Sequence, residues 1–452
     1  MLPVRMELIY NRFYRVSPGK DGGGMIKIAL LGCGTVGGGV YQLLQQNRDE
    51  ISQRAGQQLS IVKVLERDQE KCRALGILDD MMATSLEEIL NDPEIDIVVE
   101  LIGGIEPTCS MVLQAMQQGK HVVTANKDMI AERGKELFDT AEAQQVDFYF
   151  EASVAGGIPI IQPLKQSLAG NRIQQVLGIL NGTTNYILSK MSAEGSDFIE
   201  VLREAQDLGY AESDPTADVG GLDAARKAAI LASIAFNSRV TFNDVHVEGI
   251  TTISAHDIKN AAELGYVVKL LAIADEQDGR ILVRVYPALL PQQHPLSSVN
   301  DVFNAVFVRG DAVGDIMHYG RGAGAMPTAS AVVGDIIDIA RNLACHANAR
   351  IGCTCYAQKE FRSIDELETQ YYIRLTVEDR PGVLAGIAGV FGECNVSLET
   401  VMQKSFGGEG AELMLITHIT KEADLQKALS WLEQKSFVKC IDNFIRLEGI
   451  KE

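Results

Sequence analysis

The turn at residues 32–37 restricts the fold of this chain more than any other stretch. It reads Gly-Cys-Gly-Thr-Val-Gly and follows the apolar run MIKIALL, which is typical of a buried strand. A helical pattern begins at Gly38. Glycines with this spacing between a strand and a helix permit a tight turn and the close approach of a pyrophosphate, which the N–H groups of the helix attract. The turn therefore predicts a dinucleotide-binding unit with cofactor contacts from Gly32, Gly34, Thr35, Val36 and Gly37.

Four further apolar runs read as strands of the same unit, with helical patterns between them: residues 59–65, 96–101, 121–124 and 146–150. In this kind of sheet the residues after the second strand help to select the cofactor. An acidic residue there binds the ribose hydroxyls of NAD, and an arginine there accommodates the extra phosphate of NADP. Because the second strand ends in Glu66-Arg67-Asp68, the residues themselves leave both cofactors open.

The size and charge of the chain limit its class. At 452 residues it is too long for one hydrophobic core, so two or three domains are expected. Its net charge of −19 disfavours nucleic acid or an anionic membrane as a partner. No apolar run approaches the roughly 18–20 residues of a membrane span. Eight scattered cysteines fit a cytoplasmic enzyme with reduced thiols, and the Cys-His cluster at residues 345–355 lacks the spacing of a zinc site.

Residues 209–227, GYAESDPTADVGGLDAARK, concentrate acidic groups in a loop that leads into a helix. Asp223 and Lys227 are four residues apart on that helix, so they share one face. Glu212 and Asp218 lie in the loop and can fold back toward this face. The residues after Lys227 are almost uniformly apolar, which predicts a buried helix. A lysine at the mouth of a buried helix needs partners or a function.

This run resembles the signature of the homoserine dehydrogenase family, whose members interconvert L-aspartate 4-semialdehyde and L-homoserine. The resemblance continues in Asn181-Gly182-Thr183-Thr184-Asn185 and in Ala125-Asn126-Lys127, which follows a predicted strand. It implies that the catalytic residues are Lys227, as general acid toward the aldehyde oxygen, and Lys127. It also implies a set of substrate-binding residues, namely Glu212, Asp218, Asp223 and Lys127.

The same resemblance adds cofactor contacts. Arg67 falls at the family's arginine position, which favours NADP(H) while NAD(H) stays possible. Beside the nicotinamide, the resemblance implies contacts from Ile102, Gly103 and Lys127. A second glycine-rich turn, residues 320–328, is similar to a family turn that closes over the cofactor, through Gly322 or Gly324.

Residues 151–159 resemble a family segment whose backbone carbonyls hold a monovalent cation, usually sodium. The implied ligands are the carbonyl oxygens of Glu151, Val154, Gly156 and Ile158. Carbonyl coordination leaves no side-chain pattern, so this expectation depends wholly on the resemblance.

The middle of the chain alternates strand-like and helix-like patterns. Strands are expected at residues 174–180, 240–250, 281–290, 304–309 and 314–318, and a helix at residues 329–343. Together they predict an open mixed sheet with helices on one face, as the substrate domain of an α/β protein.

The C-terminal part follows a β-α-β-β-α-β order, which predicts a ferredoxin-like unit. With Asp379-Arg380-Pro381-Gly382-Val383-Leu384 after its first strand, it resembles the ACT module, which binds amino acids. The resemblance implies feedback regulation by L-threonine and a homodimer or homotetramer. A dimerisation domain without a ligand is the alternative.

The chain is therefore expected to contain a disordered extension, a Rossmann-type NAD(P)-binding domain, a substrate-binding and dimerisation domain, a linker and an ACT domain. Their expected bounds are 1–24, 25–150 completed by 320–343, 151–319, 344–369 and 370–452.

Two other functions are compatible with this organisation. An amino-acid sensor could use an inactive dehydrogenase domain as a scaffold, although a sensor has no need of the lysines and carboxylates of residues 209–227. A dehydrogenase of 2-hydroxy acids could also bear an ACT module. Such enzymes typically use a catalytic histidine, and none of the seven histidines here lies in a glycine-rich turn or a carboxylate cluster.

Overall fold

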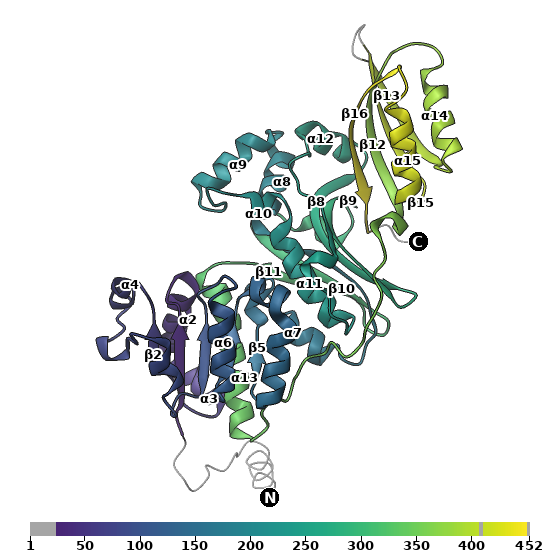
Figure 1. Cartoon of the computed structure of the whole chain (residues 1–452). Helices are drawn as coiled ribbons and strands as arrows, with labels where there is room; N and C mark the ends of the chain where they lie inside the picture. Colours follow the sequence, from purple (N-terminus) through teal and green to yellow (C-terminus); the bar gives the residue numbers. More distant parts are fainter. Residues whose placement is uncertain (1–23, 406–409, 450–452) are drawn as a thin grey trace, which may run out of the picture. The chain divides into compact units, whose positions relative to one another are not determined.

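The computed structural model describes residues 24–405 and 410–449, so the extension expected at residues 1–24 lies, except for Gly24, outside the described residues. The described chain forms two compact units (Figure 1). The first unit contains the residues up to 159 together with 323–353, and the second contains 160–322 together with the residues from 354 onward. Among the described residues, no helix has both the length and the apolar character needed to cross a membrane.

The first unit is built on a five-stranded parallel sheet in the order β2-β1-β3-β4-β5. Its strands are β1 (Ile26–Leu31), β2 (Leu59–Leu65), β3 (Ile97–Glu100), β4 (His121–Thr124) and β5 (Phe148–Tyr149). Its helices are α2 (Thr35–Gln46), α3 (Arg48–Ala55), α4 (Gln69–Ala74), α5 (Leu86–Leu90), α6 (Thr108–Gln117), α7 (Lys127–Gln144) and α13 (Ala325–Ala344). The strands are almost continuously apolar, as in parallel sheets that helices cover on both faces. The predicted dinucleotide-binding fold is confirmed.

Two helices of this unit begin earlier than predicted. Helix α2 begins at Thr35 instead of Gly38, and α13 begins at Ala325, before the predicted range 329–343. Glycines weaken the helical pattern at the start of α2 because they are poor helix formers. Pro327 obscures the start of α13, although a proline in the first turn removes no helical hydrogen bond.

The second unit is built on an 11-stranded sheet in the order β11-β10-β6-β8-β9-β16-β12-β14-β13, with β7 beside β9 and β15 beside β12. Its strands are β6 (Ile173–Ile179), β7 (Val245–Val247), β8 (Tyr266–Gln277), β9 (Arg280–Pro291), β10 (Phe303–Gly310), β11 (Gly314–Arg321), β12 (Glu368–Val377), β13 (Leu398–Ser405), β14 (Ala411–Thr417), β15 (Thr420–Lys421) and β16 (Val438–Leu447). Its helices are α8 (Gly182–Glu194), α9 (Phe198–Asp207), α10 (Thr216–Val219), α11 (Leu222–Ala235), α12 (Ala255–Glu263), α14 (Val383–Glu393) and α15 (Glu422–Leu432).

The strand predicted at residues 240–250 is wrong over most of its length. Only Val245–Val247 pair as a strand, and residues 242–244 form a short 3-10 turn instead. The side chains of Thr241 and Asp244 cap this turn reciprocally. These local hydrogen bonds satisfy the backbone groups that a strand would otherwise have to pair.

Residues 368–447 form the C-terminal module. Its four main strands lie in the order β16-β12-β14-β13 and are antiparallel, with α14 and α15 in the connections. This is the predicted ferredoxin-like arrangement. The module's sheet continues that of the rest of the second unit, because Arg446 and Leu447 of β16 pair in parallel with Ala288 and Leu289 of β9.

A buried charge network crosses the junction between β9 and β16. Arg446 is 2 % exposed and donates two hydrogen bonds, both of 2.8 Å, to the carboxylate of Glu422, which is also 2 % exposed. Its third contact is Glu248, at 2.9 Å. Burial opposes the ionisation of Glu248, but hydrogen bonds from His246 and Arg446 outweigh it and lower the pKa of this carboxyl from 4.5 to about 2.

Acid is expected to destabilise the second unit partly through Glu248. Because the folded-state pKa lies below the unfolded value, the stabilisation is complete above about pH 4.5 and is lost as the pH falls toward about 2. Thermal melting between about pH 6 and about pH 3 should therefore show a shallower loss of Tm in Glu248→Gln than in the wild type. Equal slopes for the two proteins would contradict this assignment.

Candidate active site

The three glycines of the turn after β1 differ in whether packing requires them. Gly32 has φ +91°, and a Cβ there would lie 2.8 Å from the carbonyl oxygen of Leu101. A Cβ on Gly37 would lie only 2.2 Å from the carbonyl oxygen of Gly32. Gly34, the N-cap of α2, has no atom within 4 Å of such a Cβ. The fold therefore requires Gly32 and Gly37, whereas the space in front of Gly34 is open for a ligand.

Glu66 and Arg67, at the end of β2, have different surroundings. The carboxylate of Glu66 accepts the backbone N–H of Cys33 at 2.7 Å and that of Asp68 at 3.1 Å. Burial acts against ionisation, but these backbone hydrogen bonds prevail and lower the pKa of Glu66. Both oxygens thus hold the main chain around the turn, and the exposed Arg67 is the charge that remains available beside them.

The carboxyl ends of β3 and β4 are tied together by Glu100, which is completely buried. One of its oxygens accepts the backbone N–H groups of Ile102 and Gly103 at 2.8 and 2.9 Å, and the other accepts the Thr124 hydroxyl at 2.5 Å. Lys127 is the first residue of α7, directly after this edge. The carboxyl edge of a parallel sheet is where this fold binds its ligands, and Ile102, Gly103 and Lys127 all lie there.

In the second unit, Lys227 lies inside a group of buried acceptors. Its ammonium donates to the carboxylate of Asp223 at 2.7 Å and to the carbonyl of Leu180 at 2.8 Å. The side chain is 13 % exposed. Within the described residues, these two acceptors engage two of the three N–H groups of the Lys227 ammonium. The third N–H can donate to a substrate oxygen.

Asn181 joins the two carboxylates of this cluster. Its side-chain amide donates to Asp218 at 2.7 Å and to Asp223 at 2.9 Å, while its oxygen caps α8 by accepting the N–H of Thr184 at 2.9 Å. The structure therefore brings Asp218, Asp223 and Lys227 together, as predicted from residues 209–227. Asn181 was not among the predicted site residues, although its place two residues after β6 and directly before α8 marks it as a residue at a strand's carboxyl end.

The remaining predicted substrate residue, Glu212, lies exposed in the loop before α10. The loop is fastened to α8, because the Thr183 hydroxyl donates to the carbonyl of Tyr210 at 2.6 Å. Gln206 of α9 donates to the carbonyl of Glu212 at 3.0 Å. These contacts fix the backbone on both sides of the Glu212 carboxylate.

The second glycine-rich turn spans the boundary between the units. Gly322 belongs to the second unit, and a Cβ there would overlap the side-chain amide of Asn304 at 2.1 Å. Gly324 belongs to the first unit and has φ +117°, which favours glycine. Both positions thus require glycine for reasons within their own units.

The segment predicted to hold a cation lies in the first unit. Glu151, Val154, Gly156 and Ile158 are all buried. The φ values of Ala155 and Gly156 are 56° and 55°, so two consecutive residues are left-handed and the chain turns tightly between the predicted ligands. Among the described residues, no group of three or more His, Cys, Asp or Glu side chains could hold a metal.

A pocket of about 400 Å³ opens in the C-terminal module at the loop between β12 and α14. Its lining includes residues 377–384, with Gln403 and Leu413 from the neighbouring strands. Gly382 has φ +90°, and Gln403 donates to Asp379 at 3.3 Å. The D-R-P-G-V-L loop, predicted to bind an amino acid, therefore does border a cavity.

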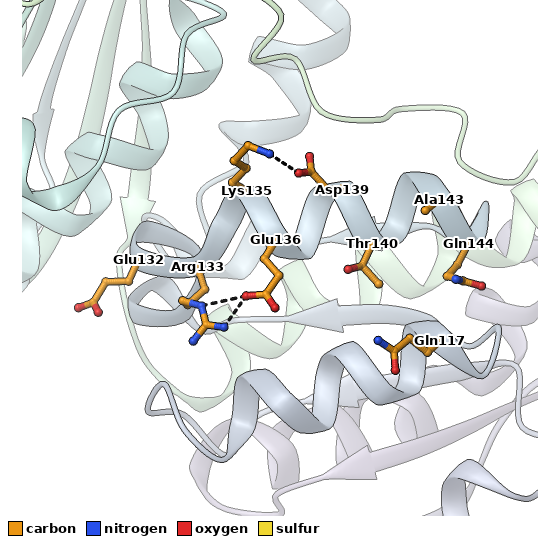
Figure 2. A pocket seen from close by; sticks show the side chains of 9 residues that line it. All are labelled: Gln117, Glu132, Arg133, Lys135, Glu136, Asp139, Thr140, Ala143 and Gln144. Atoms are coloured by element: carbon orange, nitrogen blue, oxygen red, sulfur yellow. Dashed lines mark hydrogen bonds and ion pairs between the residues drawn. The ribbon is translucent and has the colours of Figure 1, made fainter.

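A larger groove, of about 560 Å³, lies on the outer surface of α6 and α7 (Figure 2). Four of its five charged side chains pair with one another, Lys135 with Asp139 and Arg133 with Glu136. None of the predicted site residues lines it, and it is a solvated helix face.

Comparisons with known proteins cover nearly the whole chain. The family profile "Homoserine dehydrogenase, NAD binding domain" matches residues 32–151, "Homoserine dehydrogenase" matches 159–337, and "ACT domain" matches 371–435. A homoserine dehydrogenase of Corynebacterium glutamicum is 48% identical over 96% of this chain and 98% of its own length. The crystal structure of a homoserine dehydrogenase from Thiobacillus denitrificans superposes with a TM-score of 0.90, at 43% identity, covering 94% of this chain and 99% of that one. A hyperthermophilic archaeal homoserine dehydrogenase in complex with NADPH has a TM-score of 0.60 at 27% identity, covering 70% of this chain and 98% of that one.

Proposed function

The chain belongs to the homoserine dehydrogenase family, and from that premise we propose that it interconverts L-aspartate 4-semialdehyde and L-homoserine in threonine and methionine biosynthesis. The observation that carries this proposal is the cluster of Lys227, Asp223, Asp218 and Asn181. It offers one cationic donor and two carboxylates, which suit an aldehyde oxygen and the ammonium of an amino-acid substrate. We also propose the cytoplasm as the protein's location, because the eight scattered cysteines of the sequence suit a reducing compartment.

In the proposed mechanism, Lys227 gives a proton to the C4 carbonyl oxygen of the aldehyde and takes it back in the reverse reaction. The nicotinamide cofactor, when bound, supplies or accepts the hydride. Asp223 and the Leu180 carbonyl orient the Lys227 ammonium, and Asn181 holds Asp218 and Asp223 apart at fixed positions. Asp218 and Glu212 bind the substrate ammonium. We assign to Lys127 the role of a second cation for the substrate and the cofactor.

We propose NADP(H) as the preferred cofactor, with NAD(H) also accepted. The support is that Glu66 is engaged by two backbone N–H groups, whereas Arg67 is exposed beside it. The remaining cofactor contacts that we propose are Gly32, Gly34, Thr35, Val36, Gly37, Ile102, Gly103, Lys127, Gly322 and Gly324.

Arg67→Ala should raise the KM for NADPH by about tenfold or more, because a charge-assisted contact with phosphate contributes roughly 1.5–3 kcal/mol. The KM for NADH should change little, since NADH lacks that phosphate. Lys71→Ala, a neighbouring exposed cation on α4, is the matched control and should alter neither value. An equal loss with both cofactors would show that Arg67 does not read the phosphate.

We further propose a sodium ion on the carbonyl oxygens of Glu151, Val154, Gly156 and Ile158, because such oxygens suit a monovalent cation. Sodium chloride at ten times its dissociation constant should then stabilise the protein by about 1.4 kcal/mol. Thermal melting in sodium chloride and in choline chloride of equal ionic strength measures this. Identical Tm values in the two salts would exclude the site.

We propose that the C-terminal module binds an amino-acid effector in the pocket beside Gly382. The proposed effector is L-threonine, because homoserine leads to threonine. A homodimer or homotetramer is the assembly that would bring such modules together in pairs. The pocket supports ligand binding over a purely dimerising module, because the exposed residues 379–382 border a cavity between two residues of the module's core, Val377 and Val383.

The deciding experiment follows NADPH and NADH oxidation with L-aspartate 4-semialdehyde, each with and without L-threonine. Turnover that L-threonine inhibits supports both the active site and the effector site. Turnover at the same rate with and without L-threonine supports the enzymatic activity and excludes L-threonine as the effector. Cofactor binding without any turnover would instead favour an amino-acid sensor on an inactive dehydrogenase scaffold.

A further inference from the structure

The C-terminal module contacts the rest of the second unit through a residue close to the Lys227 cluster. Arg446 of β16 donates to Glu248 at 2.9 Å, as one of three hydrogen bonds from a buried guanidinium that also lies over the ring of Tyr286 in β9. Glu248 directly follows β7. Its backbone N–H donates to the carbonyl of Val285 in β9 at 2.7 Å. Glu248 is therefore held by β9 through its main chain. One oxygen of its carboxylate accepts from Arg446 of the module, and the other lies 2.7 Å from a ring nitrogen of His246 in β7.

The same segment supports the turn between the two carboxylates of the cluster. The N–H of Ile250 donates to the carbonyl of Val219 at 2.8 Å. A Cβ on Gly249 would lie 2.3 Å from that carbonyl oxygen, and a Cβ on Gly221 would lie 3.1 Å from the carbonyl of Glu248. Residues 219–221 thus lie against residues 248–250 with no space for a side chain between them.

This turn sets where the substrate groups lie. Asp218 precedes it at the end of α10, and Gly221 is the N-cap of α11, which carries Asp223 and Lys227. Because the two backbones are in direct contact, a displacement of the main chain at residues 248–250 requires a displacement of the turn. Close-packed contacts of this kind move between discrete arrangements and do not yield gradually.

We infer that Glu248 is a positioning residue of the active site, which the C-terminal module holds through Arg446 so that Asp218 and Asp223 are correctly placed for the substrate. The inference deepens the proposed function, on which its kinetic readout rests. Arg446 is buried, whereas the Glu248 side chain is 36 % exposed. An ion pair with one solvated partner adds only modest stability, and its more specific effect here is to fix the position of the Glu248 segment.

The test compares Glu248→Gln with Glu263→Gln in the full-length protein. Glu263 on α12 is the matched control, because it is also a carboxylate that pairs with a cation of the module, Lys404, at 2.7 Å. Glu248→Gln should raise the KM for L-homoserine roughly 3–30-fold, as expected for a residue that couples two sites. Its KM for NADP⁺ should stay within about twofold, Glu248→Asp should recover part of the loss, and Glu263→Gln should match the wild type. A lower Tm with an unchanged KM for L-homoserine would reduce Glu248 to a structural contact and overturn the inference.

A second readout needs no turnover. Amide hydrogen exchange of residues 219–227 should be faster in Glu248→Gln than in the wild type, and unchanged in Glu263→Gln. Faster exchange together with an inactive wild type would reject the proposed function and retain the positioning role. Unchanged exchange would reject the positioning role whatever the activity.

Discussion

Lys227→Met lowers kcat by about 10²–10⁴-fold, the usual contribution of a general acid, while NADPH binding stays near the wild-type value. Methionine fills a similar volume without a proton to give, so Asp223 and Asn181 keep their hydrogen bond of 2.9 Å. The measurement is steady-state turnover of L-aspartate 4-semialdehyde, with cofactor binding followed by NADPH fluorescence. Lys259→Met, an exposed lysine on α12, should leave both values unchanged.

Lys227→Arg distinguishes the role of Lys227 as a proton donor from its role as a positive charge. Arginine keeps a cation between Asp223 and the Leu180 carbonyl but does not release a proton in proteins. This variant should retain a near-normal KM for the aldehyde and lose most of kcat. If Lys227→Arg or Lys227→Met turned over at a near-normal rate, the acid would have to be another group.

Gly37→Ala abolishes cofactor binding by disturbing the fold of the first unit. The new methyl group would lie 2.2 Å from the carbonyl oxygen of Gly32, so the turn or the start of α2 must shift. Overpacking of this kind costs about 1–3 kcal/mol, which lowers Tm by roughly 2–12 °C in a unit of this size. NADPH titration and thermal melting of the apoprotein measure the two effects.

Gly34→Ala is the matched control, because nothing lies within 4 Å of its Cβ and its φ of −71° suits any residue. It should leave the Tm of the apoprotein unchanged and weaken NADPH binding by occupying the space in front of α2. A wild-type Tm for Gly37→Ala, or a lowered Tm for Gly34→Ala, would contradict this division of roles.

Much of the fold could be predicted because its signals are local. The five strands of the first unit are short apolar runs, and the turn after β1 combines three glycines in one context. The signature at residues 209–227 likewise carried Asp218, Asp223 and Lys227 within ten residues of one another. Where local capping competed with strand pairing, as at Thr241, the prediction failed.

The contacts that could not be predicted join distant parts of the chain. Asn181 reaches Asp223 across 42 residues, and Arg446 reaches Glu248 across 198. Asn181 follows an ordinary strand and Glu248 lies in a segment with no motif, so neither shows its partner in the sequence. The sequence also does not show that β16 connects the sheet of the module with β9. Pairing partners in a sheet depend on topology and not on composition.

The position of β16 also affects how the chain can be synthesised. Its residues leave the ribosome after those of every other strand described here, yet β16 lies between β9 and β12 in the finished sheet. Until it is made, β12 lacks the partner for one edge and β9 lacks its partner at Ala288 and Leu289. Unpaired strand edges invite pairing with other nascent chains. A chaperone that binds extended strands would have its greatest effect on yield during this interval, and translational pausing just before Val438 would prolong it.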